Sequence, residues 1–213
     1  MLVKVCGITR EEDAQLAVAL GASALGFVFW PKSPRFIDPF RARAIAASLP
    51  FGVTPVGVFV DQPPAYVNGV ASLVRLGAVQ LHGRESRAEA WTITRPVLKA
   101  IALEPLAPGD EDRVLDEWGP PMTVLLDAHD PVRRGGTGRT IDWSRAASVA
   151  RRRRVLLAGG LTAANVAEAI ARVRPFGIDV SSGVESGPGI KDPDGLRAFF
   201  EAVRGTASLE VGR

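Results

Sequence analysis

The sequence predicts an α/β protein, folded as a single (β/α)8 TIM barrel. Eight short runs rich in Val, Leu and Ile are each followed by a longer amphipathic segment. The runs are apolar nearly throughout instead of alternating, as in parallel strands that are covered on both faces. No linker rich in Gly and Ser divides the 213 residues, a length typical of one barrel domain.

The eight predicted units follow one another without interruption. The predicted strands span residues 2–6, 24–29, 54–60, 78–81, 97–101, 123–127, 155–158 and 177–180. The predicted helices span residues 11–20, 39–48, 64–76, 86–93, 111–118, 143–151, 163–172 and 193–203. Thr9 is expected to cap the first helix. Residues 1–204 are expected to form the barrel, and residues 205–213 a short, loosely attached C-terminal tail.

Composition excludes several classes of function. A single cysteine allows no intrachain disulfide, and no metal-ligand spacing is present, so no metal site is expected. No apolar run reaches the ~20 residues of a membrane span, and acidic residues at 11–13 interrupt any signal-peptide pattern. A cytoplasmic protein without membrane partners is therefore expected. The basic run 151–154 falls at a predicted helix C-terminus, where it complements the helix dipole, so no nucleic-acid partner is expected.

Polar residues and glycines gather where the predicted strands end. Cys6 ends the first strand, His82 follows the fourth and Asp127 ends the sixth. The loop after the second strand presents Arg35 between stiffening prolines. Because active sites of parallel α/β barrels lie at the carboxyl ends of the strands, these residues are candidates for one site.

The loops after the last two strands indicate a phosphate site. Gly159-Gly160 follows the seventh strand and Ser182-Gly183 follows the eighth. Glycines let main-chain N–H groups approach an anion closely, and barrels commonly bind phosphate at these two loops. Tight βα turns would use the same residues, but both clusters together favour a small phosphorylated substrate. The glycine-rich loop 135–138 lacks nucleotide-binding spacing and is expected to cover the substrate.

Each candidate also has a structural interpretation. Arg35 offers a planar fork suited to a carboxylate but could be an exposed surface residue. Asp127 ends an apolar run, which suits a general acid, although a turn-forming role is the alternative. His82 either lines the pocket or bonds to backbone in the core. Asp179 is expected to support the structure, and Lys4 to pair within the base of the barrel.

These motifs together resemble the phosphoribosylanthranilate isomerase family. The matching stretches are 4–9 (KVCGIT), 26–29 (GFVF), 33–35 (SPR), 57–59 (GVF), 80–83 (QLHG), 126–127 (LD), 136–138 (GTG), 158–161 (AGGL), 179–185 (DVSSGVE) and 189–192 (GIKD). They occur in family order over nearly the whole chain, and Trp30 is the main departure from the family pattern.

The resemblance implies a cofactor-free enzyme of tryptophan biosynthesis. Its reaction would be the Amadori rearrangement of N-(5-phosphoribosyl)anthranilate to 1-(2-carboxyphenylamino)-1-deoxyribulose 5-phosphate. It implies Cys6 as general base, Asp127 as general acid and Arg35 as the ligand of the anthranilate carboxylate. By the same resemblance Gly160, Ser182 and Gly183 would hold the phosphate, mainly through backbone amides, and the position of His82 adds it as a candidate for substrate binding.

Two alternatives remain, and the sequence discriminates between them only in part. A histidine-pathway aminoaldose isomerase resembles a two-aspartate system, whereas here Cys6 ends the first strand. A non-catalytic barrel that binds a phosphorylated metabolite would not require both Cys6 and Asp127. The sequence leaves open a monomer or a homodimer.

Overall fold

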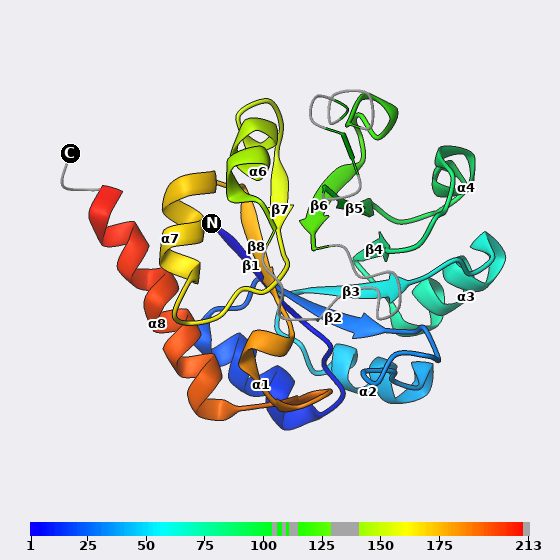
Figure 1. Ribbon diagram of the computed structural model, residues 1–213. Helices are drawn as coiled ribbons and strands as arrows, with labels where there is room; N and C mark the ends of the chain where they lie inside the picture. The colour runs from blue at the N-terminus through cyan, green and yellow to red at the C-terminus, as the bar shows by residue number, and fades with distance from the viewer. Residues whose placement is uncertain (104–105, 108–109, 111–114, 129–140, 211–213) are drawn as a thin grey trace.

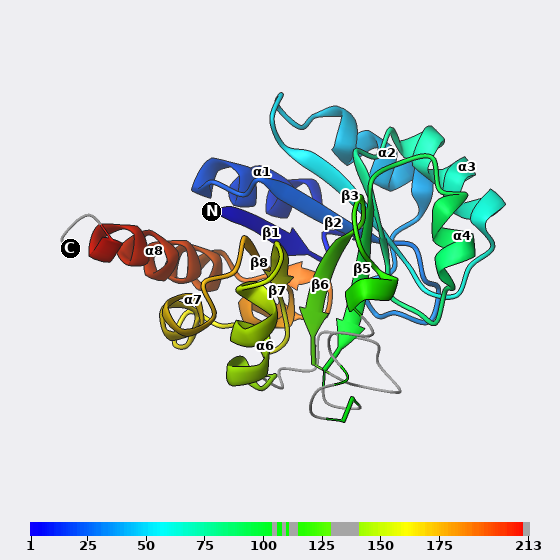
Figure 2. The ribbon, with the colours of Figure 1, turned by 90° about the horizontal axis from the view of Figure 1, so that it is seen from above.

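The computed structural model is a closed barrel of eight parallel strands, β1 to β8 in sequence order, surrounded by helices (Figures 1 and 2). It describes residues 1–103, 106–107, 110, 115–128 and 141–210. The strands are β1 Leu2–Cys6, β2 Ala24–Val28, β3 Thr54–Phe59, β4 Ala78–Leu81, β5 Val97–Ala102, β6 Thr123–Asp127, β7 Val155–Leu157 and β8 Gly177–Val180. The predicted fold is confirmed, and every strand agrees with its predicted range to within one residue at each end.

The helices alternate with the strands. They are α1 Glu11–Leu20, α2 Pro39–Ala47, α3 Pro64–Val74, α4 Arg87–Trp91, α6 Trp143–Ala150, α7 Val166–Val173 and α8 Pro193–Glu210. The fifth predicted helix, 111–118, lies partly outside the described residues; residues 115–117 are helical. Helix α8 continues past the predicted end at residue 203, through much of the predicted tail. The division at residue 204 stays a prediction.

Two local predictions were wrong. Arg10, not Thr9, is the N-cap of α1, and the Thr9 hydroxyl instead donates a hydrogen bond to the Gly189 carbonyl. Helix α7 begins three residues later than predicted because the Asn165 side chain is engaged with the preceding loop. Its amide donates to the Gly160 carbonyl and its oxygen accepts from the Thr162 N–H.

The two faces of the barrel wall differ in composition. Outward-facing side chains such as Val5, Phe27 and Leu126 are fully buried beneath the helices and form the main core. Inside the barrel, Ala24, Val56 and Ala78 pack together in a separate apolar layer, while other inward positions carry polar groups. Because adjacent residues of a strand point to opposite faces, polar residues two apart in an apolar strand share the interior.

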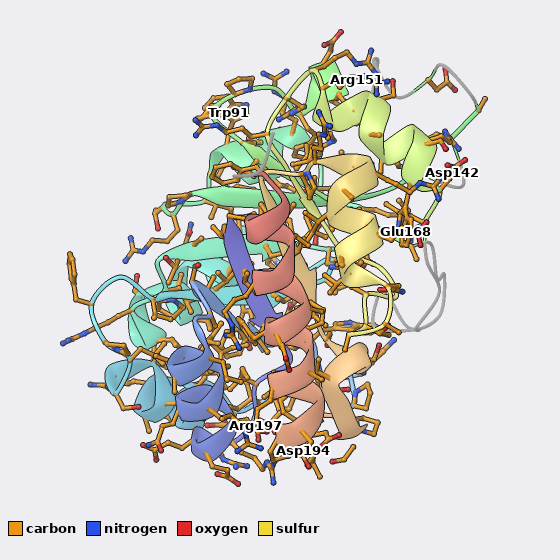
Figure 3. The ribbon with its side chains drawn as sticks, turned by 90° about the vertical axis from the view of Figure 1, so that its left-hand side faces the viewer. Trp91, Asp142, Arg151, Glu168, Asp194 and Arg197 are labelled. Atoms are coloured by element: carbon orange, nitrogen blue, oxygen red, sulfur yellow. The ribbon has the colours of Figure 1, made fainter. Side chains whose placement is uncertain are left out.

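Helix α8 covers the junction where the barrel closes. Strand β1 pairs with β8, with Lys4 opposite Asp179. In Figure 3, α8 runs lengthwise between α1 and α7, with β1 behind it, and both flanking helices contact it. Near its start, Arg197 and Asp194 form an exposed ion pair of 2.9 Å. Pairing with β2 and β8 beneath this helix holds β1, whose last residue is Cys6.

Candidate active site

The predicted acid and base both lie inside the barrel at the carboxyl ends of their strands. Cys6 ends β1 and is 8% exposed, and Asp127 ends β6 and is 7% exposed. Cys6 packs beside Val28 and Val58 of β2 and β3. The two groups thus occupy the end of the barrel where catalytic residues of this fold stand.

Two glycines make room around the thiol. A Cβ on Gly26, the neighbour of Cys6 on β2, would lie 2.7 Å from the Cys6 sulfur. Gly7 has a φ of +80°, and a Cβ there would lie 2.6 Å from Cδ of Arg35. The backbone can therefore turn away after Cys6 while the Arg35 side chain crosses directly over the turn.

Burial and charge act on the thiol in opposite directions. Burial is the largest influence and raises the pKa of Cys6, because the charged thiolate loses solvation. Lys4 and Lys191 lower the pKa of Cys6, whereas Asp179 raises it. The net direction is upward, so the thiolate needs positive partners to form within the site.

Asp127 lies in a cluster of polar side chains with His82 and Gln80. Nε2 of His82 lies 3.3 Å from Oδ2 of Asp127, and Nδ1 of His82 lies 2.8 Å from Nε2 of Gln80. With the Gln80 amide donating to Nδ1, neutral His82 carries its proton on Nε2, the nitrogen that faces Asp127. The other oxygen of Asp127 accepts from the Ala128 N–H at 2.8 Å. Gln80 and His82 therefore form a polar chain that leads to Asp127.

Arg35 is anchored by a carboxylate of the chain itself. Its Nε lies 3.0 and 3.1 Å from the two oxygens of Glu185, and its Nη2 lies 2.7 Å from one of them. Lys191 Nζ also contacts Glu185, at 2.8 Å, and donates to the carbonyls of Cys6 and Ser181. Burial would raise the pKa of Glu185, but the two cations together lower it. Arg35 is thus held in place, with Nη1 left without an acceptor among the described residues.

The loops after β7 and β8 meet around a small cavity. It is lined by Asp127, Ala158, Gly159, Gly160, Leu161, Asp179, Ser181, Ser182 and Gly183. A Cβ on Gly183 would overlap the Leu161 carbonyl oxygen, so glycine is required for the loops to approach this closely. Within the described part of the chain, the main-chain N–H groups of Gly160, Ser182 and Gly183 have no acceptor. Such free amides favour an anion.

The structure therefore brings all seven predicted residues to the same end of the barrel. The glycine-rich loop 135–138 lies outside the described residues, and among the residues that are described no three His, Cys, Asp or Glu side chains are grouped as metal ligands. No described helix is long and apolar enough to span a bilayer.

Sequence reasoning did not assign site roles to the polar residues that support the predicted ones. These are Gln80, Glu185 and Lys191, which hold His82 and Arg35 in place. The signal was present in part, because Gln80 stands two positions before His82 in an apolar strand, the spacing that shares a face. Nothing in the sequence indicated that Glu185 pairs with Arg35, 150 residues away.

The chain matches known proteins over almost its full length. Residues 3–202 match the family model described as N-(5'-phosphoribosyl)anthranilate (PRA) isomerase. An N-(5'-phosphoribosyl)anthranilate isomerase from Geotalea uraniireducens is 47% identical over 203 residues, covering 95% of this chain and 98% of that protein. One from Chromohalobacter salexigens is 48% identical over 205 residues, covering 96% and 94%.

Solved structures agree with the sequence comparisons. The crystal structure of phosphoribosyl anthranilate isomerase from Thermotoga maritima has a TM-score of 0.88 and 44% identity, covering 96% of this chain and all of that one. A second isomerase structure, in complex with reduced 1-(o-carboxyphenylamino)-1-deoxyribulose 5-phosphate, has a TM-score of 0.84 and 42% identity, with the same coverage. The chain described here belongs to the N-(5'-phosphoribosyl)anthranilate isomerase family.

Proposed function

We propose that this barrel converts N-(5'-phosphoribosyl)anthranilate to 1-(2-carboxyphenylamino)-1-deoxyribulose 5-phosphate, with Asp127 as general acid and Cys6 as general base. Family membership makes the chain an aldose–ketose isomerase of tryptophan biosynthesis. The observation that carries the assignment of roles is the placement of Cys6 and Asp127 inside one barrel mouth, beside free main-chain amides suited to a phosphate.

The two groups divide the reaction into two proton transfers. Asp127 donates a proton to the furanose ring oxygen, the ring C–O bond breaks, and a protonated Schiff base forms. This cation acidifies the C2' proton, which the Cys6 thiolate removes, giving an enolamine that tautomerises to the ketone. Nε2 of His82 lies 3.3 Å from Oδ2 of Asp127 and helps to hold the carboxyl group in place. No cofactor takes part in this sequence of steps.

Substrate recognition is proposed at the two ends of the mouth. Arg35 uses Nη1 for the anthranilate carboxylate, because Glu185 occupies its other nitrogens. Gly160, Ser182 and Gly183 hold the phosphate mainly through backbone N–H groups. These residues line a small cavity, and the phosphate would lie at its opening.

The decisive experiment is turnover of freshly generated phosphoribosylanthranilate, followed by its fluorescence and by identification of the product. Cys6→Ala and Asp127→Asn should each lower kcat by about 10²- to 10⁴-fold, the range for loss of a general acid or base. Retention of wild-type turnover by either variant would refute the role assigned to that residue. Conversion of a histidine-pathway aminoaldose in place of this substrate would refute the proposed substrate.

Assembly and location are also proposals. A monomer or a homodimer is proposed, and one similar structure, 42% identical, is of monomers generated from the dimeric isomerase of Thermotoga maritima. Sedimentation equilibrium over a range of concentrations distinguishes the two states. A cytoplasmic location is proposed from the biosynthetic role, and cell fractionation tests it.

A further inference from the structure

A fully buried lysine lies inside the barrel on the same strand face as the proposed base. Lys4 stands two residues before Cys6 in β1, is 0% exposed, and pairs with Asp179 of β8 at 2.9 Å. The neighbouring interior positions on β2 and β3 are apolar, with Ala24 opposite Lys4 and Val56 packed beside it. A buried ion pair is a weak source of stability compared with apolar side chains, so stability alone does not account for Lys4.

The ammonium of Lys4 is hydrogen-bonded to Asp179 at 2.9 Å, and its side chain shares the interior strand face with the Cys6 thiol two residues along β1. Among the described residues, the charged groups that act on the thiol are Lys4 from β1, Asp179 from β8 and Lys191 from β10, Ile190–Lys191. Strands β2 and β3 face it with uncharged residues. Lys191 directs its ammonium to two carbonyls and to Glu185. Lys4 is therefore the cation that shares the interior strand face with the thiol.

The charge of Lys4 is retained despite its burial. Burial lowers the pKa of Lys4, but Asp179 and Cys6, which both carry negative charge when ionised, outweigh that effect and raise it. Lys4 is also the largest influence that lowers the pKa of Cys6, stronger than the opposing effect of Asp179. Lys4 therefore acts on the thiol in the direction that favours the thiolate.

We propose that Lys4 is a positioning residue for Cys6, whose ammonium, tethered by Asp179, stabilises the thiolate that accepts the C2' proton. The inference rests on the proposed role of Cys6 as base. It assigns a function to an ion pair that otherwise contributes little to the barrel. Lys4 acts through Cys6 and does not itself take the substrate proton.

The single cysteine of the chain allows a direct test. Protein labelled with [3-13C]cysteine gives one resonance, and its pH titration reports the ionisation of Cys6 without requiring reagent access. In Lys4→Met/Asp179→Asn, both charges are removed together, so no unpaired charge is left buried. We expect the titration of Cys6 to move to higher pH, with about tenfold less thiolate at a fixed pH below the titration midpoint.

Kinetics should show the same displacement. In the double variant, the rising limb of kcat against pH should move to higher pH in step with the NMR titration, with kcat about tenfold lower on that limb. The single variant Lys4→Arg keeps the positive charge, so its kcat on that limb should fall less than the kcat of the double variant. An unchanged or lowered Cys6 titration in the double variant would overturn the inference, as would a loss of activity that does not vary with pH.

A matched control removes a second buried pair that lies away from Cys6. Lys99 and Glu85 are 2.7 Å apart and both are buried. Lys99→Met/Glu85→Gln should leave the titration of Cys6 and the pH profile unchanged; displacement of either would show that loosening of the barrel, and not the charge of Lys4, moves the thiol.

Cys6→Ala separates the inference from the proposed function. If that variant retained turnover, the role of Cys6 as base would be refuted, and with it the catalytic part of the inference. The NMR titration would still decide independently whether Lys4 stabilises the thiolate.

Discussion

Two buried lysine–carboxylate pairs lie on opposite faces of the barrel wall. Lys4–Asp179 is inside, at 2.9 Å, and Lys99–Glu85 is outside, at 2.7 Å, beneath the loop after β4. Glu85 also accepts from the N–H groups of Asp61 and Gly83, and Lys99 donates to the Gly83 carbonyl.

The same chemistry therefore has different consequences on the two faces. The outer pair closes a hydrogen-bonded network within two loops, so its effect should be on folding. The inner pair lies against the Cys6 thiol, so its effect should reach the reaction. The position of a buried charge relative to the reacting atoms, and not its burial, decides whether it acts on catalysis.

The largest expected effect is on stability, from breaking the outer pair on one side only. Lys99→Met leaves the Glu85 carboxylate buried without its cation, which should lower the free energy of unfolding by about 3 to 5 kcal/mol. Denaturant unfolding measures this loss. The kcat of the folded fraction should stay within about twofold of wild type, and a tenfold loss of kcat would contradict the distinction between the two faces.

Two glycines test the same distinction through packing. A Cβ on Gly57, on the outer face, would meet Leu76 and Phe59, whereas a Cβ on Gly26 would meet Cys6. Gly57→Ala should lower the free energy of unfolding by about 1 to 3 kcal/mol through overpacking, with kcat retained. Gly26→Ala should displace the thiol and lower kcat about tenfold. Unfolding curves and steady-state kinetics of both variants make the comparison; equal losses of kcat would contradict it.

A third comparison uses one substitution at two buried carboxylates. Glu185→Gln removes the charge that orients Arg35 through hydrogen bonds from Nε and from Nη2, and Glu85→Gln makes the same change on the outer face. Because the amide cannot accept both charge-assisted bonds, the KM of Glu185→Gln should rise about tenfold, the equivalent of about 1.4 kcal/mol. The KM of Glu85→Gln should not change. Steady-state kinetics at one pH decides between these outcomes, and an equal rise in both variants would refute the role given to Glu185.

Sequence reasoning located the barrel and the residues at its mouth because these depend on local patterns. Apolar runs and the residues that end them gave the eight strands, with Cys6 and Asp127 at two of their ends. The site residues that it assigned were drawn partly from loops and partly from a family resemblance. The structure shows that these residues share one end of the barrel. Their spacing along the chain agrees with this arrangement but does not give the distances between them.

The partners of those residues required the three-dimensional structure. Arg35 is close to Glu185, and Lys4 to Asp179, only because the barrel closes between β1 and β8. Pairing across 150 or more residues depends on the register of that closure, and a single sequence contains no periodic signal for it. The late start of α7 was missed for a related reason, since the Asn165 side chain competes locally with helix formation.

The smallest expected effect is a dependence of stability on alkaline pH that belongs to the inner face. Burial raises the folded-state pKa of Cys6 above its value in the unfolded chain, so the native state binds the thiol proton more tightly. This contribution to stability is complete below the unfolded pKa of about 8.5 and is lost as pH rises through the folded pKa. The free energy of unfolding of wild type should therefore fall by about 1 kcal/mol more than that of Cys6→Ser at alkaline pH.

The two double variants compare the faces of the barrel in the same measurement. Lys99→Met/Glu85→Gln should keep the wild-type dependence on pH, whereas Lys4→Met/Asp179→Asn should enlarge it, because the thiol then lacks its cation. Urea unfolding at a series of pH values measures all four proteins, and parallel curves for wild type and Cys6→Ser would show that the thiol does not couple to folding.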